Sequence, residues 1–360
     1  MKIAFYLPRV YYNPGGGAKI VLEYADYLAN KGHSVSVYYH IPSISFQRPY
    51  TVKRNIRIGI DYLMGELYGC SRWFALNKNV KQKIITNVNE IDPCDIVVAT
   101  AIQLVEPILN LPQQYKNKVY LIQGFETWEF PEKRIFSIYK KSKNNIVISR
   151  WLKNIVDGNS DESAYLIPNS IDSNIFFNSN QHRIPHSITF HYRSAPIKGC
   201  KYAVKIITEL YKLYPDLKVK VISTEKKIPE LPKCCEIFTN VKPCKVAEIN
   251  NYCEIFMCTT IEEGFGLPGL EAMACGCALV TTNYAAVYDY AEDNYNALIS
   301  PVKDTDKMLE NIIRIFEDTT LKSKLSRNAV NTAMQRSKKV SLASMEKYFE
   351  ELVNNTNDEN

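Results

Sequence analysis

The sequence predicts an α/β protein with two doubly wound parallel sheets, one following the other along the chain. The chain has 360 residues, more than a single hydrophobic core usually accommodates, so two domains are expected. Short apolar runs alternate with helical patterns, which is typical of parallel sheets covered by helices on both faces. This alternation stops at the turn residues 168–170 and starts again near residue 187.

Five apolar runs in the first half predict strands, because they are short and are bounded by turn residues or helical patterns. These runs are residues 2–8, 33–40, 95–100, 118–124 and 145–150. Residues 18–32 predict a helix, since Ile20, Tyr24 and Leu28 recur at the helical period and Gly32 is a common stop residue. No segment is apolar enough to span a membrane, and the N-terminus indicates a first strand rather than a signal peptide.

The second half repeats the pattern. Strands are predicted at 187–193, 217–223, 254–260 and 277–283, and helices at 201–215, 245–253 and 266–276. Residues 340–355 predict a last amphipathic helix, and the polar tail after it is expected to be disordered. We therefore expect two Rossmann-like domains with a cleft between them, in which ligands bind at the carboxyl ends of the strands.

Charge is unevenly distributed between the two halves. Residues 1–150 contain 20 Lys+Arg and 11 Asp+Glu, a net charge of +9, whereas residues 151–360 contain 24 and 27, a net charge of −3. Basic clusters lie at 48–57, 77–83 and 139–143. We expect an anionic membrane surface as a partner of the first half, and Trp73, Phe74 and Leu76 suit a headgroup interface. The alternative is that these lysines are only solvated, and no zinc-finger, RNP or helix-turn-helix pattern supports a nucleic-acid partner.

A glycine-rich segment, residues 13–25, separates the first predicted strand from its helix. It does not satisfy the dinucleotide fingerprint G-x-G-x-x-G, because Ile20 occupies the third glycine position. The second strand also ends in His40 rather than in an acidic residue, so a hydride-transfer enzyme is not expected. Gly16 and Gly17 nevertheless allow backbone at a helix N-terminus to approach a ligand closely.

Two cations follow the first strand of the second half. Arg193 comes directly after this strand, and Lys198 stands just before Gly199 and the next helix. Both fall at the carboxyl edge of a parallel sheet. A diphosphate would be recognised there by the planar fork of the arginine and the point charge of the lysine.

The segment EEGFGLPGLEAMACGCALVTTN, residues 262–283, brings two carboxylates to the same sheet edge. Glu263 precedes a predicted helix, Glu271 lies about one turn inside it, and Gly264 and Gly266 free backbone N–H groups between them. An ionised carboxylate accepts hydrogen bonds from two adjacent hydroxyls, so the pattern predicts a phosphate group flanked by diols. A nucleotide-diphosphate sugar has this chemistry. The helix dipole alone would also explain Glu271.

This segment resembles the E-x7-E signature of retaining GT-B glycosyltransferases, specifically glycosyltransferase family 4. The glycine loop with its helix and second strand, the Arg…Lys-Gly diphosphate motif in RSAPIKG, and the interdomain segment LIPNSIDSNIF resemble further motifs of that family. The resemblance implies a GT-B fold with an acceptor-side domain at 1–168 and a nucleotide-sugar-binding domain at 169–340. It also implies a C-terminal helix within 341–360 that packs back on the first domain.

The resemblance implies roles for the matching positions. Glu263 would hold the hydroxyls of the donor sugar and Glu271 the ribose. Arg193 and Lys198 would neutralise the departing diphosphate. The other positions implied to contact the nucleotide sugar are Gly16, Gly17, Asn169 at the interdomain hinge, and the backbone amides of Phe265, Gly266 and Leu267.

The chain departs from the family pattern at residues 123–126. These read Gln-Gly-Phe-Glu, whereas the family often has a histidine there that touches the donor sugar. Gln123 and Glu126 are therefore expected on the acceptor side of the site. The variant is similar to rhamnosyltransferase-like members that build surface polysaccharides, and it leaves the donor sugar open.

The expected function is transfer of a hexosyl group from a nucleotide-diphosphate sugar to an acceptor hydroxyl with retention of configuration, in surface polysaccharide or glycoconjugate biosynthesis. The acceptor would be a glycan or a lipid-linked glycan. No cofactor is expected, and the absence of a D-x-D pattern predicts that no metal ion is required. Ten cysteines without a secretory signal favour the cytoplasm, with a peripheral position at the inner face of the membrane as a further expectation.

Two alternatives remain open. The first is a nucleotide-sugar epimerase of the same fold, which would release free nucleotide without an acceptor. The second is a catalytically silent homologue that binds a partner transferase. The presence of Arg193, Lys198 and Glu263 together disfavours the second alternative.

Overall fold

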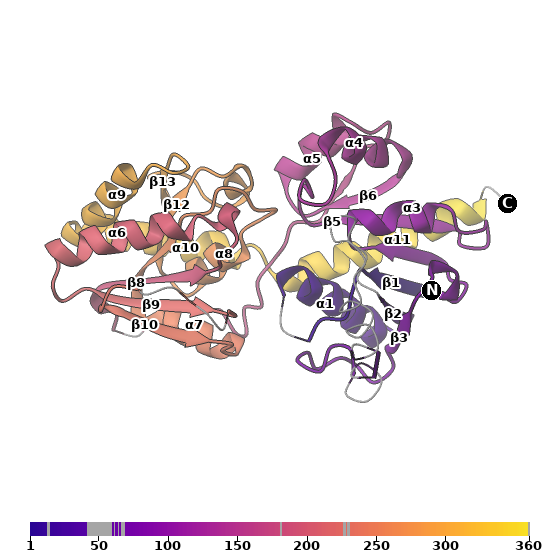
Figure 1. Ribbon diagram of the computed structural model, residues 1–360, viewed down its shortest axis with the longest axis horizontal. Coiled ribbons are helices and arrows are strands. Elements are labelled where there is room, and N and C mark those ends of the chain that lie inside the picture. The colour runs from indigo at the N-terminus through magenta and orange to yellow at the C-terminus, as the bar shows by residue number, and fades with distance from the viewer. Residues whose placement is uncertain are drawn as a thin grey trace. The chain divides into compact units, whose positions relative to one another are not determined.

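The computed structural model describes residues 1–12, 15–41, 60, 62–63, 65, 69–180, 182–225, 228 and 231–358. The basic cluster at 48–57 lies outside these residues. The chain divides into two compact units: unit 1 is Met1–Pro168 with Lys339–Asn360, and unit 2 is Asn169–Lys338. Each unit holds one parallel sheet (Figure 1), so the predicted class of two parallel-sheet α/β domains is confirmed.

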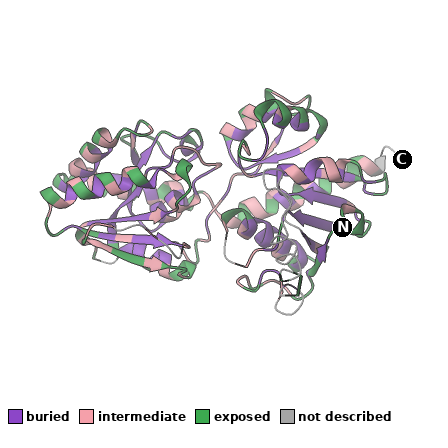
Figure 2. Ribbon diagram, in the orientation of Figure 1, coloured by how far each residue is buried: buried purple, intermediate pink, exposed green. Residues whose placement is uncertain are grey.

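The described part of unit 1 forms a seven-stranded sheet in the order β3-β2-β1-β4-β5-β6-β7, and its neighbouring strands are parallel. The strands are β1 (Lys2–Leu7), β2 (Ser34–His40), β3 (Lys81–Ile85), β4 (Ile96–Ala99), β5 (Asn117–Ile122), β6 (Asn144–Val147) and β7 (Tyr165–Leu166). Figure 2 shows that the central strands are buried along most of their length, as expected where helices cover both faces. The order of the strands reverses between β1 and β4.

The helices of unit 1 bury apolar stripes against this sheet. They are α1 (Gly16–Asn30), α3 (Val105–Leu109), α4 (Glu132–Lys141), α5 (Arg150–Asp157) and α11 (Lys338–Asp358), with the short 3₁₀ helices η1 (Val88–Glu90) and η2 (Ile102–Leu104). Helix α1 begins two residues earlier than predicted, because Gly16 and Gly17 belong to its first turn. No helix in the described ranges is long and apolar enough to cross a bilayer.

Strand β3 is an addition to the elements predicted from the sequence. The pattern at 77–83 indicates only a basic cluster, but Lys81 and Lys83 lie exposed on an edge strand while Ile84 and Ile85 are buried. Lysines on an edge strand oppose pairing with a strand of another molecule. Part of this cluster therefore has a structural explanation that the sequence pattern did not suggest.

Helix α11 packs along unit 1, far from the rest of that unit in sequence (Figure 1). Phe349 is fully buried, with its ring centroid 6.5 Å from that of Phe5. The ring of Tyr348 stacks on Tyr165 at 4.3 Å. The C-terminal helix thus contributes to the hydrophobic core of unit 1.

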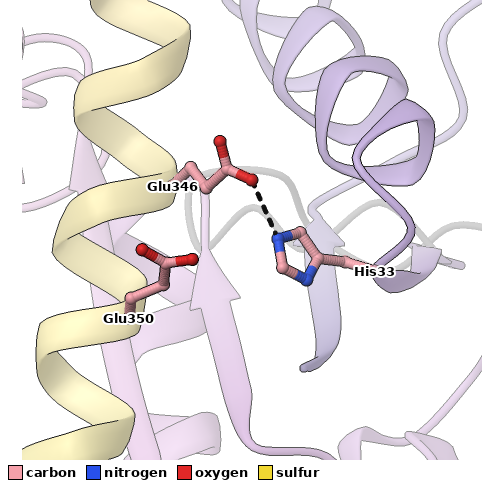
Figure 3. A group of neighbouring side chains, drawn as sticks. All are labelled: His33, Glu346 and Glu350. Carbon is pink, nitrogen blue, oxygen red and sulfur yellow. Dashed lines mark hydrogen bonds and ion pairs between the residues drawn. The ribbon is translucent and has the colours of Figure 1, made fainter.

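A polar group also holds α11 in place. Among the described residues, His33, Glu346 and Glu350 form the one group with donor types suited to a metal ion (Figure 3). However, Nε2 of His33 lies 3.1 Å from a Glu346 oxygen, and the hydroxyl of Tyr27 donates to the other oxygen at 3.0 Å. Glu346 thereby connects α11 to α1 and to the turn that follows α1.

Unit 2 contains a six-stranded sheet within the described residues, in the order β10-β9-β8-β11-β12-β13. Its strands are β8 (Ile184–Tyr192), β9 (Lys218–Ser223), β10 (Cys235–Thr239), β11 (Cys253–Cys258), β12 (Ala278–Thr282) and β13 (Ala297–Ser300). One face of this sheet packs on two helices through buried residues such as Phe190, Ile207 and Ile312. The order of the strands reverses between β8 and β11.

The strands of unit 2 are parallel, and helices connect them. The helices are η3 (Pro196–Lys198), α6 (Cys200–Leu213), α7 (Pro243–Tyr252), α8 (Leu267–Ala274), η4 (Ala285–Asp289), α9 (Thr305–Glu317) and α10 (Thr319–Met334). The guanidinium of Arg183 donates to the carbonyls of Asn250, Cys253 and Cys275, at 3.0, 2.5 and 2.5 Å. One cation therefore satisfies carbonyl groups at the ends of α7 and α8, where the helix dipole favours positive charge.

Candidate functional site

The candidate site lies at the carboxyl edge of the unit 2 sheet, where the strand order reverses. Open α/β sheets bind ligands at such a switch point, because the chains leaving the two neighbouring strands turn in opposite directions. Arg193 directly follows β8, and Glu263 follows β11 after a short loop. The loops that carry the predicted diphosphate and sugar contacts therefore leave neighbouring strands.

Lys198 and Glu263 are in direct contact. The ammonium Nζ of Lys198 is 3.1 Å from Oε1 of Glu263, and 26% of each side chain is exposed. Two backbone N–H groups, of Ile261 and Glu262, donate to the carbonyl of Ile197 at 2.7 and 3.3 Å and tie η3 to the loop after β11. The partial exposure leaves both charged groups accessible to a ligand.

Arg193 is held against the end of its own strand. Its Nη1 donates to the carbonyl of Tyr192 at 2.9 Å. Burial lowers the pKa of Arg193, and the nearby carboxylates of Glu225 and Glu263 oppose that shift. Glu225 also accepts hydrogen bonds from the backbone and hydroxyl of Ser194, at 2.7 and 3.1 Å. Glu225 is a neighbour of the site that the sequence analysis did not identify.

Gly199 joins η3 to α6 in the left-handed conformation, with φ of 63°. A Cβ atom at this position would approach the carbonyl oxygen of Thr259 to well under 3.0 Å, closer than real Cβ atoms come. Thr259 lies just beyond β11. Glycine is thus required for the loop bearing Lys198 to cross the end of β11 closely.

A glycine-rich turn leads into α8. It comprises residues 264–267, of which Leu267 is the first residue of α8, and we refer to it as the 264–267 turn. Gly266 has φ of 96° and is the N-cap of α8. Its carbonyl accepts hydrogen bonds from the N–H of Gly269 at 3.0 Å and from the hydroxyl of Tyr290 at 2.9 Å. Phe265 is buried, with its ring centroid 5.5 Å from that of Tyr290.

Tyr284 and Tyr290 form a buried pair behind this turn. Their hydroxyl oxygens are 2.6 Å apart, and burial raises the pKa of each phenol well above its usual value. A Cβ on Gly266 would collide with the Tyr284 hydroxyl, and a Cβ on Gly269 would lie 2.7 Å from that of Tyr290. Neither tyrosine was predicted from the sequence, because neither belongs to a recognisable motif.

Glu271 lies in α8, one turn after Leu267, and is half-buried. It stands eight residues after Glu263 in the sequence, and α8 determines where it lies relative to the 264–267 turn. Asn169, at the start of unit 2, is buried, and its Oδ1 has no hydrogen-bond partner in the described part of the chain. A buried carbonyl oxygen without a partner is unusual and suits a contact with water or a ligand.

In unit 1, Gly17 and Gln123 lie close together. Gln123 follows β5, and its side-chain amide would lie 3.2–3.3 Å from a Cβ placed on Gly17. Gly16 and Gly17 are exposed in the first turn of α1. This glycine loop follows β1, which neighbours β4 at the switch point of the first sheet.

The side chain of Glu126 forms hydrogen bonds within unit 1. Its Oε2 accepts hydrogen bonds from the N–H of Ile102, at 2.8 Å, and from the hydroxyl of Tyr120. Burial raises the pKa of Glu126 to about 7, although these two donors oppose the shift. In this structure the carboxyl group therefore ties the loop after β5 to the loop after β4.

The family comparison concerns unit 2. The family model described as Glycosyl transferases group 1 matches residues 174–332. This stretch is similar to a glycosyl transferases group 1 domain, and we refer to it as the group 1 domain. The group 1 domain contains the Arg193 loop, Lys198, the 264–267 turn and both tyrosines behind it.

Two curated glycosyltransferases are similar to part of the chain. An uncharacterized glycosyltransferase of Methanocaldococcus jannaschii is 22% identical over 210 residues, 58% of this chain and 59% of that protein. An N,N'-diacetylbacillosaminyl-diphospho-undecaprenol alpha-1,3-N-acetylgalactosaminyltransferase of Campylobacter jejuni is 27% identical over 110 residues, 31% of this chain and 29% of that protein. The chain thus matches less than two thirds of the length of either relative.

A solved structure resembles the whole chain in fold. HepE from Anabaena, in complex with UDP-glucose, gives a TM-score of 0.72 at 14% identity, covering 99% of this chain and 100% of that chain. At this identity the likeness shows the fold. The predicted GT-B class is confirmed.

Proposed function

We propose that the protein is a retaining glycosyltransferase, which moves a hexosyl group from a nucleotide-diphosphate sugar to an acceptor hydroxyl. The observation that carries the proposal is the convergence of Arg193, the Lys198–Glu263 pair and the 264–267 turn at one switch point. Two cations and a helix N-terminus suit a diphosphate, and a carboxylate beside them suits sugar hydroxyls.

The residues of this site support the following chemistry. The bond between the anomeric carbon and the diphosphate oxygen breaks, and the acceptor oxygen bonds to the same face of the sugar. The acceptor proton passes to the departing diphosphate, so no separate base is needed. Arg193 and Lys198 stabilise the negative charge that develops on the diphosphate, which is electrostatic catalysis by groups already in position. In this proposal the two cations take the place of a metal ion.

Substrate screening tests the proposal. UDP-, GDP-, ADP- and dTDP-sugars are added separately, and the thermal unfolding midpoint is measured. A bound ligand at 100 times its Kd stabilises the folded state by about 2.7 kcal/mol. The stabilising donor is then incubated with and without glycan acceptors, and the anomeric configuration of the product is determined by NMR. Acceptor-independent release of nucleotide would instead support the epimerase alternative, and the absence of any stabilising nucleotide sugar would refute the proposal.

The two glutamates are expected to differ in their effect on nucleotide binding. Glu271→Gln should weaken the binding of free nucleoside diphosphate about 10- to 100-fold, since loss of a hydrogen bond to a charged group costs about 1.5–3 kcal/mol. Glu263→Gln should not weaken it, because Glu263 faces Lys198 and its removal leaves that ammonium free for phosphate. Glu263→Gln should still impair turnover of the sugar donor. Calorimetry with nucleotide alone separates the variants, and equal losses of affinity would contradict this division of roles.

We further propose that the acceptor is a lipid-linked glycan at the cytoplasmic face of a membrane, in surface polysaccharide biosynthesis, and that unit 1 docks there. The described basic residues do not contribute equally. Lys140 and Lys141 pair with Asp161 and Glu106, at 3.6 and 2.9 Å. The cluster at 77–83 has lysines exposed at the sheet edge, so it is the better candidate for anionic headgroups.

Vesicle co-sedimentation tests this docking. Each basic residue near an anionic surface contributes about 1 kcal/mol, so Lys78→Gln with Lys81→Gln should reduce partitioning roughly thirtyfold at low salt. The matched control, Lys140→Gln with Lys141→Gln, removes two lysines that already have acidic partners and should change binding much less. Protein that stays in the supernatant with strongly anionic vesicles at low salt would exclude membrane docking.

A further inference from the structure

We propose that Tyr284 and Tyr290 are positioning residues for diphosphate binding, because they fix the 264–267 turn from behind. This inference rests on the proposed function, in which the backbone amides of that turn contact the diphosphate. Both tyrosines are buried, at 1% and 4% exposure. They would act only through the backbone that they hold.

The hydrogen bonds have a defined direction. The hydroxyl of Tyr290 donates to the carbonyl of Gly266 at 2.9 Å. A phenol hydroxyl has a single hydrogen, and that of Tyr290 is already directed to Gly266. In the 2.6 Å contact between the two hydroxyls, Tyr284 must therefore be the donor and Tyr290 the acceptor. The chain of donors therefore runs from Tyr284 through Tyr290 to the peptide group at the N-cap of α8.

The glycines of the turn are explained by the same pair. The space where side chains of Gly266 and Gly269 would stand is occupied by the two tyrosine hydroxyls. Gly266 also needs its positive φ, but Gly269 lies within α8, and no positive φ is involved there. At Gly269 the hydroxyl of Tyr290 is therefore the reason for glycine, and the turn and the tyrosine pair fit each other.

A fixed orientation of the Gly266–Leu267 peptide group favours binding of an anion such as a diphosphate. Amide donors bind an anion well only if they are held in place before it arrives, since reorienting them would consume binding energy. Tyr290 anchors the carbonyl of Gly266, and the same peptide unit carries the N–H of Leu267. Loss of the anchor should leave the fold intact but weaken the hold on the diphosphate.

The decisive experiment uses Tyr290→Phe alone and in combination with Gly269→Ala. Tyr290→Phe removes one hydroxyl and should lower the unfolding midpoint by several degrees and the affinity for nucleoside diphosphate about tenfold. In the double variant, the nearest atoms to the new methyl are the ring carbons at 3.5 and 3.6 Å, an ordinary contact. The methyl fills the space of the hydroxyl and favours the helix, so it should restore the midpoint but not the affinity.

UDP, GDP, ADP and dTDP are the probes, and binding is measured by calorimetry at a temperature where each variant is fully folded. Tyr39→Phe serves as the matched control, because it removes a buried hydroxyl that donates to Gln82 in unit 1, at 3.0 Å. It should leave nucleotide affinity unchanged. If wild-type protein binds none of the four probes, the proposed function fails. If it binds one, and Tyr290→Phe binds equally well or recovers affinity with Gly269→Ala, the positioning role is overturned.

Discussion

Replacement of Lys198 or Arg193 by alanine is expected to reduce turnover of the sugar donor by about 10²–10³, the usual effect of losing one contact to developing charge. Both side chains are partly exposed. Lys198 already pairs with a carboxylate at 3.1 Å, so its ammonium is available to a phosphate that displaces this partner. Arg193 is held rigidly by the carbonyl of Tyr192. Steady-state transfer, measured with the donor found by screening, gives both values.

The control for these variants is Lys201→Ala. Lys201 is an exposed lysine only three residues beyond Lys198, but it lies on the surface of α6 with its ammonium 5.0 Å from the ring centroid of Tyr202. Its removal changes the net charge by the same amount and should leave turnover near wild type. Near-wild-type rates in both Lys198→Ala and Arg193→Ala would refute the diphosphate assignment.

Gly199→Ala is expected to produce a large loss of stability. An alanine in the left-handed region costs about 1–2 kcal/mol. The new methyl would also collide with the backbone oxygen of Thr259, and overpacking of this kind costs about 1–3 kcal/mol more. A total of roughly 3 kcal/mol should lower the unfolding midpoint by about 10 °C.

Gly32→Ala separates the two contributions. Gly32 has φ of 88°, but no atom lies within 4 Å of the position that a Cβ would take. This variant should therefore show only the conformational cost, with a shift of about 2–8 °C. Thermal unfolding of both proteins, followed by circular dichroism, provides the comparison. Equal shifts would mean that the contact with Thr259 is relieved without cost.

Periodicity predicted the central elements because their environment leaves a simple pattern in the sequence. Strands such as β4 are buried on both faces and appear as continuous apolar runs. Strand β3 is different: it lies at an edge, and its lysines obscure the two isoleucines that it buries. Its pairing with β2 depends on residues more than 40 positions away, and no local pattern records such a partner.

The candidate site was predictable where glycines and charges occur together in one segment. The order of the strands brings the loops with Lys198 and Glu263 together, and this follows from parallel topology. The reason for Gly269 was not predictable, because it depends on Tyr290, which approaches from a loop 21 positions later. The inward orientation of Glu126 was also hidden, since its donors come from Tyr120 and Ile102 on neighbouring segments.

The return of α11 to unit 1 has a consequence for folding during synthesis. Unit 2 is continuous in sequence, so all of its core has left the ribosome when Lys338 emerges. Unit 1 is not complete at that stage, because Phe5 still lacks Phe349 and Tyr165 lacks Tyr348. The first unit to be translated is therefore the last to be finished, because Phe5 and Tyr165 gain these ring contacts only when α11 has been made.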